Sequence, residues 1–275
     1  MIKRFPVILL TLFTAACARP GNQPLAVAKK IFSKEADPHF IQLHSTGDYQ
    51  GHPNGEDLPA GVQPSFRILR QTATNSVIAM NLAAVGPHAD KYLFFSKDSG
   101  IWQLNAIGAP TLARADNRRK QEMESLTETQ IDSILQESQQ YSSPAYKTRE
   151  AFDFILHSLR LKLSPDDTLV AHFNRHKAGF EQLLAAAQQV NYTLQDDRNT
   201  LADSRTPAYQ SMLISNVTKG GFLPEQCFDF HILYDQVGYL YVADERYLPE
   251  LRPDKVMMLR KVGKGWYLYK VAIYL

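Results

Sequence analysis

Two histidines four residues apart open the search for chemistry in this chain. In the segment HFNRH, His172 and His176 would project from one face of a helix. Two imidazoles at this spacing can hold a zinc ion. The segment lacks the glutamate that must follow the first histidine in a catalytic zinc helix, and Arg175 and Lys177 add positive charge that disfavours a cation. We interpret the segment as a solvated helix flank and predict no metal site.

A cysteine and a histidine in the segment EQCFDFHILY offer a nucleophile and a base. Cys227 and His231 would lie on one face of a strand. Four residues along a strand span about 13 Å, so the two side chains cannot touch. Because Cys227 occupies an apolar alternating position, we predict a buried, inert thiol.

The region before residue 91 is rich in groups that can transfer protons. A buried imidazole or carboxylate there could act as a general base if its pKa lay near the working pH. Most of these residues fall in sequences typical of loops, and the chain has no G-x-S-x-G, no phosphate-binding glycine loop and no Cys-x-x-Cys, so we expect no cofactor. The residues are His39, His44, His52, His88, Asp48, Asp57 and Asp90.

The last third of the chain is unusually aromatic. On strands, Tyr239 would share a sheet face with Tyr241, and Tyr267 with Tyr269. Such a stripe is either a core whose hydroxyls reach the rim or a face that contacts a ligand or a partner. We keep the four tyrosines as the candidate face.

Two hairpins are predicted by glycine turns between apolar strands. The segment YLFFSKDSGIWQLNAI turns at Asp98-Ser99-Gly100, and VMMLRKVGKGWYLYKVAI turns around Gly263 and Gly265. In the first hairpin, Tyr92 and Phe94 alternate with Leu93 and Phe95. Both faces are therefore apolar, and we expect both to be covered.

Helices are expected between the two β-rich regions. The clearest helix start is SPDD, with Ser164 as the N-cap, Pro165 in the first turn, and Asp166 and Asp167 near the positive end of the helix dipole. The apolar positions that follow keep a spacing of three to four residues.

The pattern as a whole predicts an α+β protein with two modules, each with an antiparallel sheet and packed helices. We expect an N-terminal α+β domain at 25–118 and a C-terminal domain at 119–275, helical over 125–190 and antiparallel β over 209–275. The hairpin from Tyr92 to Ile107 resembles the terminal hairpin of the cystatin-like or NTF2-like fold, which implies an NTF2-like first domain.

The first residues have the three parts of an export signal. Lys3 and Arg4 precede a short apolar run and then small residues. The run is too short to span a bilayer, which takes about 20 residues. Thr14-Ala15-Ala16-Cys17 resembles the bacterial lipobox, although that family prefers leucine at the position of Thr14. The resemblance implies removal of residues 1–16 and a diacylglycerol on Cys17.

Lipidation would leave residues 17–24 as a short tether to the membrane. Acyl chains add about 0.8 kcal/mol of membrane affinity per buried methylene. Ala18 follows the cysteine in place of the aspartate that retains lipoproteins at the inner membrane, which implies an outer-membrane protein facing the periplasm. The alternatives are ordinary secretion, with cleavage after Ala16 or Ala18, and an uncleaved N-terminal anchor.

Charge excludes one class of partner. The whole chain has a formal net charge of +2, and the export signal carries two of its cations and no acid. A nearly neutral mature chain lacks the excess of positive charge with which proteins bind the phosphates of nucleic acid. Its 14 Phe and 13 Tyr argue against disorder.

We expect a membrane-anchored bacterial envelope lipoprotein that acts as a non-enzymatic binding or assembly module. Its partners would be the lipid membrane, through Cys17, and an envelope protein or a small molecule. One alternative is a small NTF2-like hydrolase or isomerase that uses a His or Asp of the N-terminal domain. Another is a passive structural protein of the envelope.

The anchor gives the first test. Cys17→Ser should abolish incorporation of radiolabelled palmitate and release the chain from the membrane fraction, because no thiol remains to be acylated. Cys227→Ser is the matched control and should label like the wild type. Unchanged labelling of Cys17→Ser would contradict the lipobox interpretation.

Overall fold

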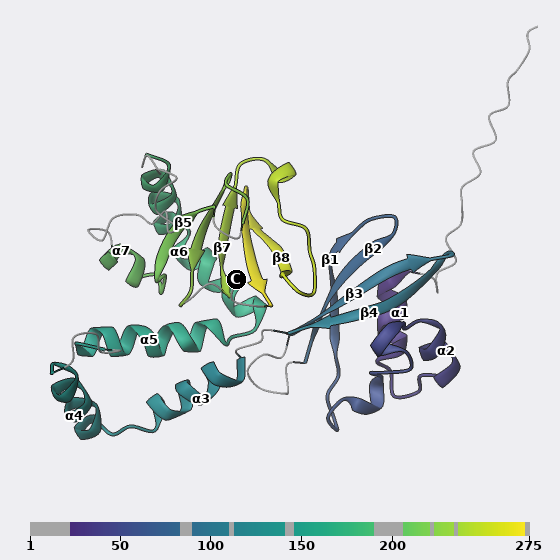
Figure 1. The fold of residues 1–275 in the computed structure, drawn as a ribbon, viewed down its shortest axis with the longest axis horizontal. Helices are drawn as coiled ribbons and strands as arrows, with labels where there is room; N and C mark the ends of the chain where they lie inside the picture. Colours follow the sequence, from purple (N-terminus) through teal and green to yellow (C-terminus); the bar gives the residue numbers. More distant parts are fainter. Residues whose placement is uncertain are drawn as a thin grey trace, which may run out of the picture.

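The computed structural model has an α+β architecture with two antiparallel sheets (Figure 1). It describes residues 23–82, 90–109, 113–140, 146–189, 206–220, 223–233 and 236–272. Cys17 and His88 lie outside these residues. The α+β class with two antiparallel sheets, expected from the sequence, is confirmed.

The helices and strands follow in chain order. The helices are α1 (Pro24–Ile31), α2 (Pro38–Leu43), α3 (Ala113–Glu124), α4 (Glu128–Ser138), α5 (Arg149–Lys162), α6 (Asp166–Gln188) and α7 (Thr206–Gln210). The strands of the first sheet are β1 (Ser65–Gln71), β2 (Asn75–Asn81), β3 (Asp90–Asp98) and β4 (Ile101–Gly108). Those of the second are β5 (Asn216–Lys219), β6 (Cys227–His231), β7 (Val237–Val242), β8 (Val256–Gly263) and β9 (Trp266–Val271).

The first sheet is a meander in the order β1-β2-β3-β4. Its last hairpin turns at Ser99 and Gly100, with φ angles of 49° and 85°. Two consecutive positive φ values are what a two-residue turn needs to match the twist of the flanking strands. The hairpin predicted from the glycine at this turn is confirmed.

Both faces of the first sheet are covered, as the alternation in β3 predicts. Leu93 and Phe95 pack with Val27 and Ile31 of α1. Tyr92 and Phe94 point the other way, into a larger core that also contains residues of α6 and of the second sheet. The two sheets therefore share one continuous apolar core.

The second sheet has the order β5-β6-β7-β9-β8. One of its faces packs against α6, where Phe173 and Phe180 meet Trp266 with ring centroids 5.2 and 5.8 Å apart. Trp266 begins β9 directly after the turn at Gly265, whose φ is 73°. The indole at the start of this strand thus closes the core beneath α6.

The start of α6 differs from the sequence prediction. The N-cap position is Pro165, and its side chain caps nothing. Ser164 instead donates its hydroxyl to the carbonyl oxygen of Arg160, at the end of α5. The carboxylate of Asp90, on β3, accepts from the backbone N–H of Asp166 at 2.8 Å. A distant acid from the first sheet therefore caps this helix.

A buried network of polar groups joins the two sheets at this point. Lys270 Nζ of β9 lies 2.7 Å from an oxygen of Asp166 and 3.9 Å from an oxygen of Asp90. The hydroxyl of Tyr92 donates to Asp166 at 2.9 Å, and Asn81 donates to Asp90 at 2.6 Å. Lys270, Asp166 and Asp90 are at most 4% exposed. Burial, and then the charge of Asp166, raise the pKa of Asp90.

Helices α3, α4 and α5 extend to one side of the sheets, with α4 at the far end (Figure 1). Helix α3 packs on α5, and Met123, Ile131 and Phe152 belong to a separate small apolar cluster. A buried ion pair, with 2.7 Å between Lys162 Nζ and Asp116, ties α5 to α3.

The buried network generates a prediction about stability. Lys270→Met should lower the free energy of unfolding by about 3–5 kcal/mol, because it leaves two buried carboxylates without their cation. Urea unfolding followed by tryptophan fluorescence measures the change. Lys261→Met removes an exposed lysine from neighbouring β8 and should cost under about 1 kcal/mol. Equal effects of the two variants would refute a special role for Lys270.

Candidate functional site

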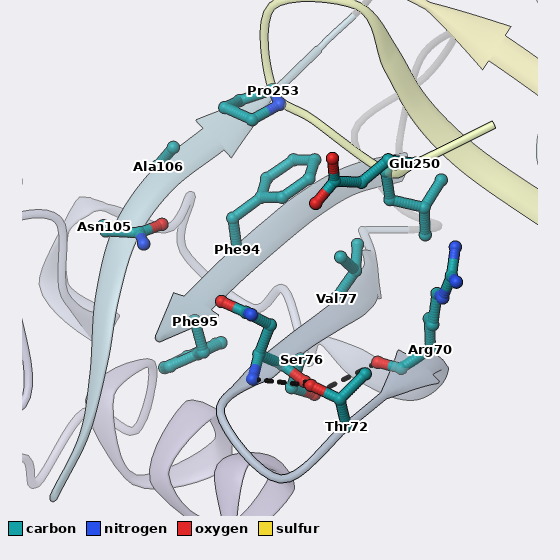
Figure 2. A pocket seen from close by; sticks show the side chains of 12 residues that line it. Arg70, Thr72, Ser76, Val77, Phe94, Phe95, Asn105, Ala106, Glu250 and Pro253 are labelled. Carbon is teal, nitrogen blue, oxygen red and sulfur yellow. Dashed lines mark hydrogen bonds between the residues drawn. The ribbon is translucent and has the colours of Figure 1, made fainter. Parts of the chain in front are cut away.

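A groove of about 340 Å³ lies where the first sheet meets the segment Glu250–Pro253, which precedes β8 (Figure 2). This volume is within the usual range for small-molecule sites. The groove lies at the edge of the shared core, so its floor is continuous with that core. We take it as the candidate site.

The floor is a row of side chains that crosses all four strands of the first sheet. Strand register pairs Arg70 with Val77, Val77 with Phe94, and Phe94 with Ala106. Residues directly opposite each other in an antiparallel sheet share a face. Val77, Phe94 and Ala106 therefore form an apolar floor, with Arg70 at one end of the row.

Two irregularities flank this row. The register of β1 shifts between Ile68 and Arg70, which leaves Leu69 without a partner on β2. The pairing of β3 with β4 passes over Asn105 in the same way. Extra residues of this kind bend a strand and change the direction of its side chains. Asn105 lines the groove beside Ala106.

Polar groups surround the apolar floor. Thr72 Oγ1 accepts from the backbone N–H of Asn75 at 2.9 Å and so shapes the turn between β1 and β2. The hydroxyl of Ser76, which is 2% exposed, donates to the carbonyl oxygen of Arg70 at 3.4 Å. Figure 2 shows these bonds at one end of the groove.

Among the described residues that line the groove, two are charged: Arg70 and Glu250. Neither takes part in an ion pair that the structure records among the residues it describes. Arg70 makes only a long hydrogen bond, 3.4 Å, to the carbonyl oxygen of Pro249. By contrast, Arg67 and Arg260 both pair with Asp167. The guanidinium of Arg70 is thus available to a ligand.

The four candidate tyrosines do not form one face. Tyr239 belongs to the core under α6, whereas Tyr267 and Tyr269 lie on the opposite face of the second sheet. Tyr239 and Tyr269 are 0% exposed and Tyr267 is 6% exposed. Tyr241 packs edge-on against Trp266, with 5.3 Å between the ring centroids.

The hydroxyls of two of these tyrosines donate hydrogen bonds to other groups of the protein. Tyr239 donates to the carbonyl oxygen of Leu169 at 2.8 Å, and burial raises its pKa well above the usual range. Tyr267 donates to Glu245 at 2.7 Å, and burial followed by this bond raises its pKa. Both hydroxyls thus make hydrogen bonds within the fold.

The proton-transfer candidates of the N-terminal region are scattered. No histidine or aspartate is among the described residues that line the groove. His44 Nδ1 lies 2.7 Å from the carbonyl oxygen of Trp102, and Asp90 belongs to the buried network. His52 lines a separate cavity beside α2. His39, Asp48 and Asp57 lie in or beside short helical turns of the same region.

Cys227 and His231 have different partners, as their spacing predicts. His231 Nε2 lies 2.8 Å from the Thr218 hydroxyl, and its Nδ1 lies 3.3 Å from the Tyr269 hydroxyl. The thiol of Cys227 points to the carbonyl oxygen of Tyr247, 3.7 Å away. Burial raises the pKa of this thiol to about 12, so Cys227 is protonated at neutral pH.

The interpretation of His172 as part of a solvated flank is wrong. His172 is 8% exposed, and its Nε2 lies 2.9 Å from the carbonyl oxygen of Met212, just after α7. The apolar face of α6 is wider than the sequence suggested, because α7 packs against it. Within the described residues, no group of three or more His, Cys, Asp or Glu could hold a metal.

Sequence reasoning missed the groove. Its residues come from four strands and from a segment about 150 positions later in the chain, and none belongs to a recognised motif. Comparison of the chain with family models, with curated proteins and with solved structures found no match. None of the described helices is long and apolar enough to cross a bilayer.

The buried position of His172 predicts a pH dependence. Burial lowers the pKa of this imidazole from 6.5 to about 4, with smaller contributions from His176 and Arg175, while the bond to Met212 opposes the change. The unfolded chain therefore binds the proton first as the pH falls. The free energy of unfolding should have its full value above about pH 6.5. It should fall by up to about 3 kcal/mol as the pH falls towards 4.

Urea unfolding at pH 7 and pH 4.5 measures this decline. His172→Gln, which keeps an N–H donor for the Met212 carbonyl, should lose less stability between the two pH values than the wild type. His157→Gln changes an exposed histidine of α5 and should behave like the wild type. An identical decline in His172→Gln would show that other groups cause it.

Proposed function

We propose that this chain is a lipid-anchored protein of the bacterial envelope whose folded part binds a small molecule without transforming it. The groove between the first sheet and the segment Glu250–Pro253 is the observation that carries the binding role. It combines an apolar floor with an arginine and a carboxylate that have no ion-pair partner among the described residues. Sites of this kind bury the apolar part of a ligand and use a few polar groups to orient it.

The anchor follows from the export signal and the lipobox-like sequence at Cys17. Helix α1 begins at Pro24, so few residues separate the acylated cysteine from the folded part. A tether of this length keeps the folded part close to a membrane surface. The residue after Cys17 is alanine, which supports an outer-membrane position facing the periplasm.

The first module is proposed to be NTF2-like. The support is a helix, α1, that packs on a four-stranded meander ending in the hairpin from Tyr92 to Ile107. The alternative, a hydrolase or isomerase of that kind, would use a His or Asp of this domain. None of the described residues that line the groove is a His or an Asp.

Native mass spectrometry of residues 17–275 carrying Cys17→Ser tests the binding role. The gently purified chain should retain an adduct of defined mass. Ala106→Phe should lose it, because the half-buried Ala106 lies in the floor and a ring there fills the groove. The melting temperature should stay within a few degrees of the parent value.

The matched control is Ala36→Phe, which places the same ring in the separate cavity beside α2. It should keep the adduct. A parent chain without any adduct, or an adduct that persists in Ala106→Phe, would overturn the proposed binding role of the groove.

A further inference from the structure

A second cavity, of about 350 Å³, adjoins the groove. The segment Leu248–Pro253, which we call the strap, contributes residues to both cavities. Half of the described residues that line the second cavity are leucines: Leu69 comes from β1, Leu259 from β8, and Leu248 and Leu251 from the strap. The other residues that line this cavity are Tyr267 and three charged side chains, Arg70, Glu245 and Lys261. We call it the leucine cavity.

The two cavities share Arg70 and Leu251. Arg70 is exposed and stands at the end of the row that forms the groove floor. Its long bond to Pro249 directs it towards the strap. A ligand in the leucine cavity would therefore meet this guanidinium where the cavity opens towards the groove.

The other charges of the leucine cavity are already paired. Lys261 Nζ lies 2.7 Å from Glu245, and the same carboxylate accepts from the Tyr267 hydroxyl at 2.7 Å. Glu250 lines the groove but not the leucine cavity. Among the described residues that line this cavity, the charge that remains uncompensated is thus the positive charge of Arg70.

We propose that the leucine cavity binds a single-chain alkyl carboxylate, with the chain among the leucines and the carboxylate on Arg70. This assignment goes beyond the proposed function, because it concerns a second cavity and names a class of ligand for it. A guanidinium presents parallel N–H donors that match the two oxygens of a carboxylate. Aliphatic walls favour an unbranched hydrocarbon, because each methylene removed from water strengthens binding.

Isothermal titration of residues 17–275 carrying Cys17→Ser with dodecanoate tests the assignment. Dodecanoate should bind more tightly than dodecanol and more tightly than dodecyltrimethylammonium. Decanoate should bind roughly tenfold more weakly than dodecanoate, because two methylenes are absent. Equal binding of the anionic and the cationic amphiphile would overturn the assignment.

Variants locate the site. Arg70→Gln should weaken dodecanoate binding roughly tenfold and leave dodecanol binding unchanged. Leu248→Trp, which fills the leucine cavity from a half-buried position of the strap, should weaken both. The matched controls are Arg118→Gln, on exposed α3, and Leu126→Trp, in the half-buried edge of the α3–α5 cluster. Both should bind like the parent chain.

The outcomes separate this inference from the proposed function. If Ala106→Phe removes the native adduct but dodecanoate binds equally to the parent chain and to Arg70→Gln, the carboxylate assignment fails and the binding groove stands. If dodecanoate binds with Arg70 dependence while Ala106→Phe keeps the adduct, the leucine cavity stands and the groove is not the site. A parent chain that binds no amphiphile would also overturn the assignment.

Discussion

The buried contact between Lys270 and the carboxylates of Asp166 and Asp90 fixes how the two sheets meet. It joins β3 of the first sheet, the first turn of α6 and the last strand of the second sheet. Ion pairs removed from water are strongly dependent on geometry, because each charge loses its hydration and only well-placed partners replace it. A displacement of any of these elements would leave a buried charge without its partner, and the network therefore penalises other arrangements. The N–H of Asp166 adds direction, since it donates to Asp90 at the positive end of the α6 dipole.

Everything proposed about binding depends on that arrangement. The shared core covers Tyr92 and Phe94 of the first sheet, and beyond it the same face continues to Ala106 and becomes the groove floor. The strap, which precedes β8 of the second sheet, also lines the groove. The groove and the leucine cavity are thus properties of the junction, and neither sheet alone would form them. Sites at the meeting of two modules are common because a concave surface arises there without a cost to either core.

Local features of the fold were predictable from the sequence, and long-range ones were not. The turn at Ser99 and Gly100 follows from a glycine between apolar strands, and the alternation in β3 indicated two covered faces. Asp90, by contrast, looked like one loop acid among several. Its partner at the start of α6 lies 76 positions away, and no periodicity connects them. The N-cap predicted at Ser164 is wrong for the same reason. The group that accepts from the first turn of α6 is the carboxylate of Asp90, which comes from the first sheet.

The candidate site could not be predicted from the sequence for a related reason. Catalytic motifs can be searched for because a reaction requires particular groups at particular distances. A binding groove requires only an apolar floor and a few polar groups, which ordinary strand residues such as Val77, Phe94 and Ala106 supply. Tyrosines drew attention because they are dense in the sequence, yet three of the four are buried in packing. Arg70 is distinguished instead by context: nearby Arg67 and Arg260 share Asp167, and the residue at the opening of two cavities has no acid of its own among the described residues. The positive charge of Arg70 has no acidic partner among the described residues and lies beside leucine side chains. This combination is what would make the region where the two sheets meet select one kind of ligand.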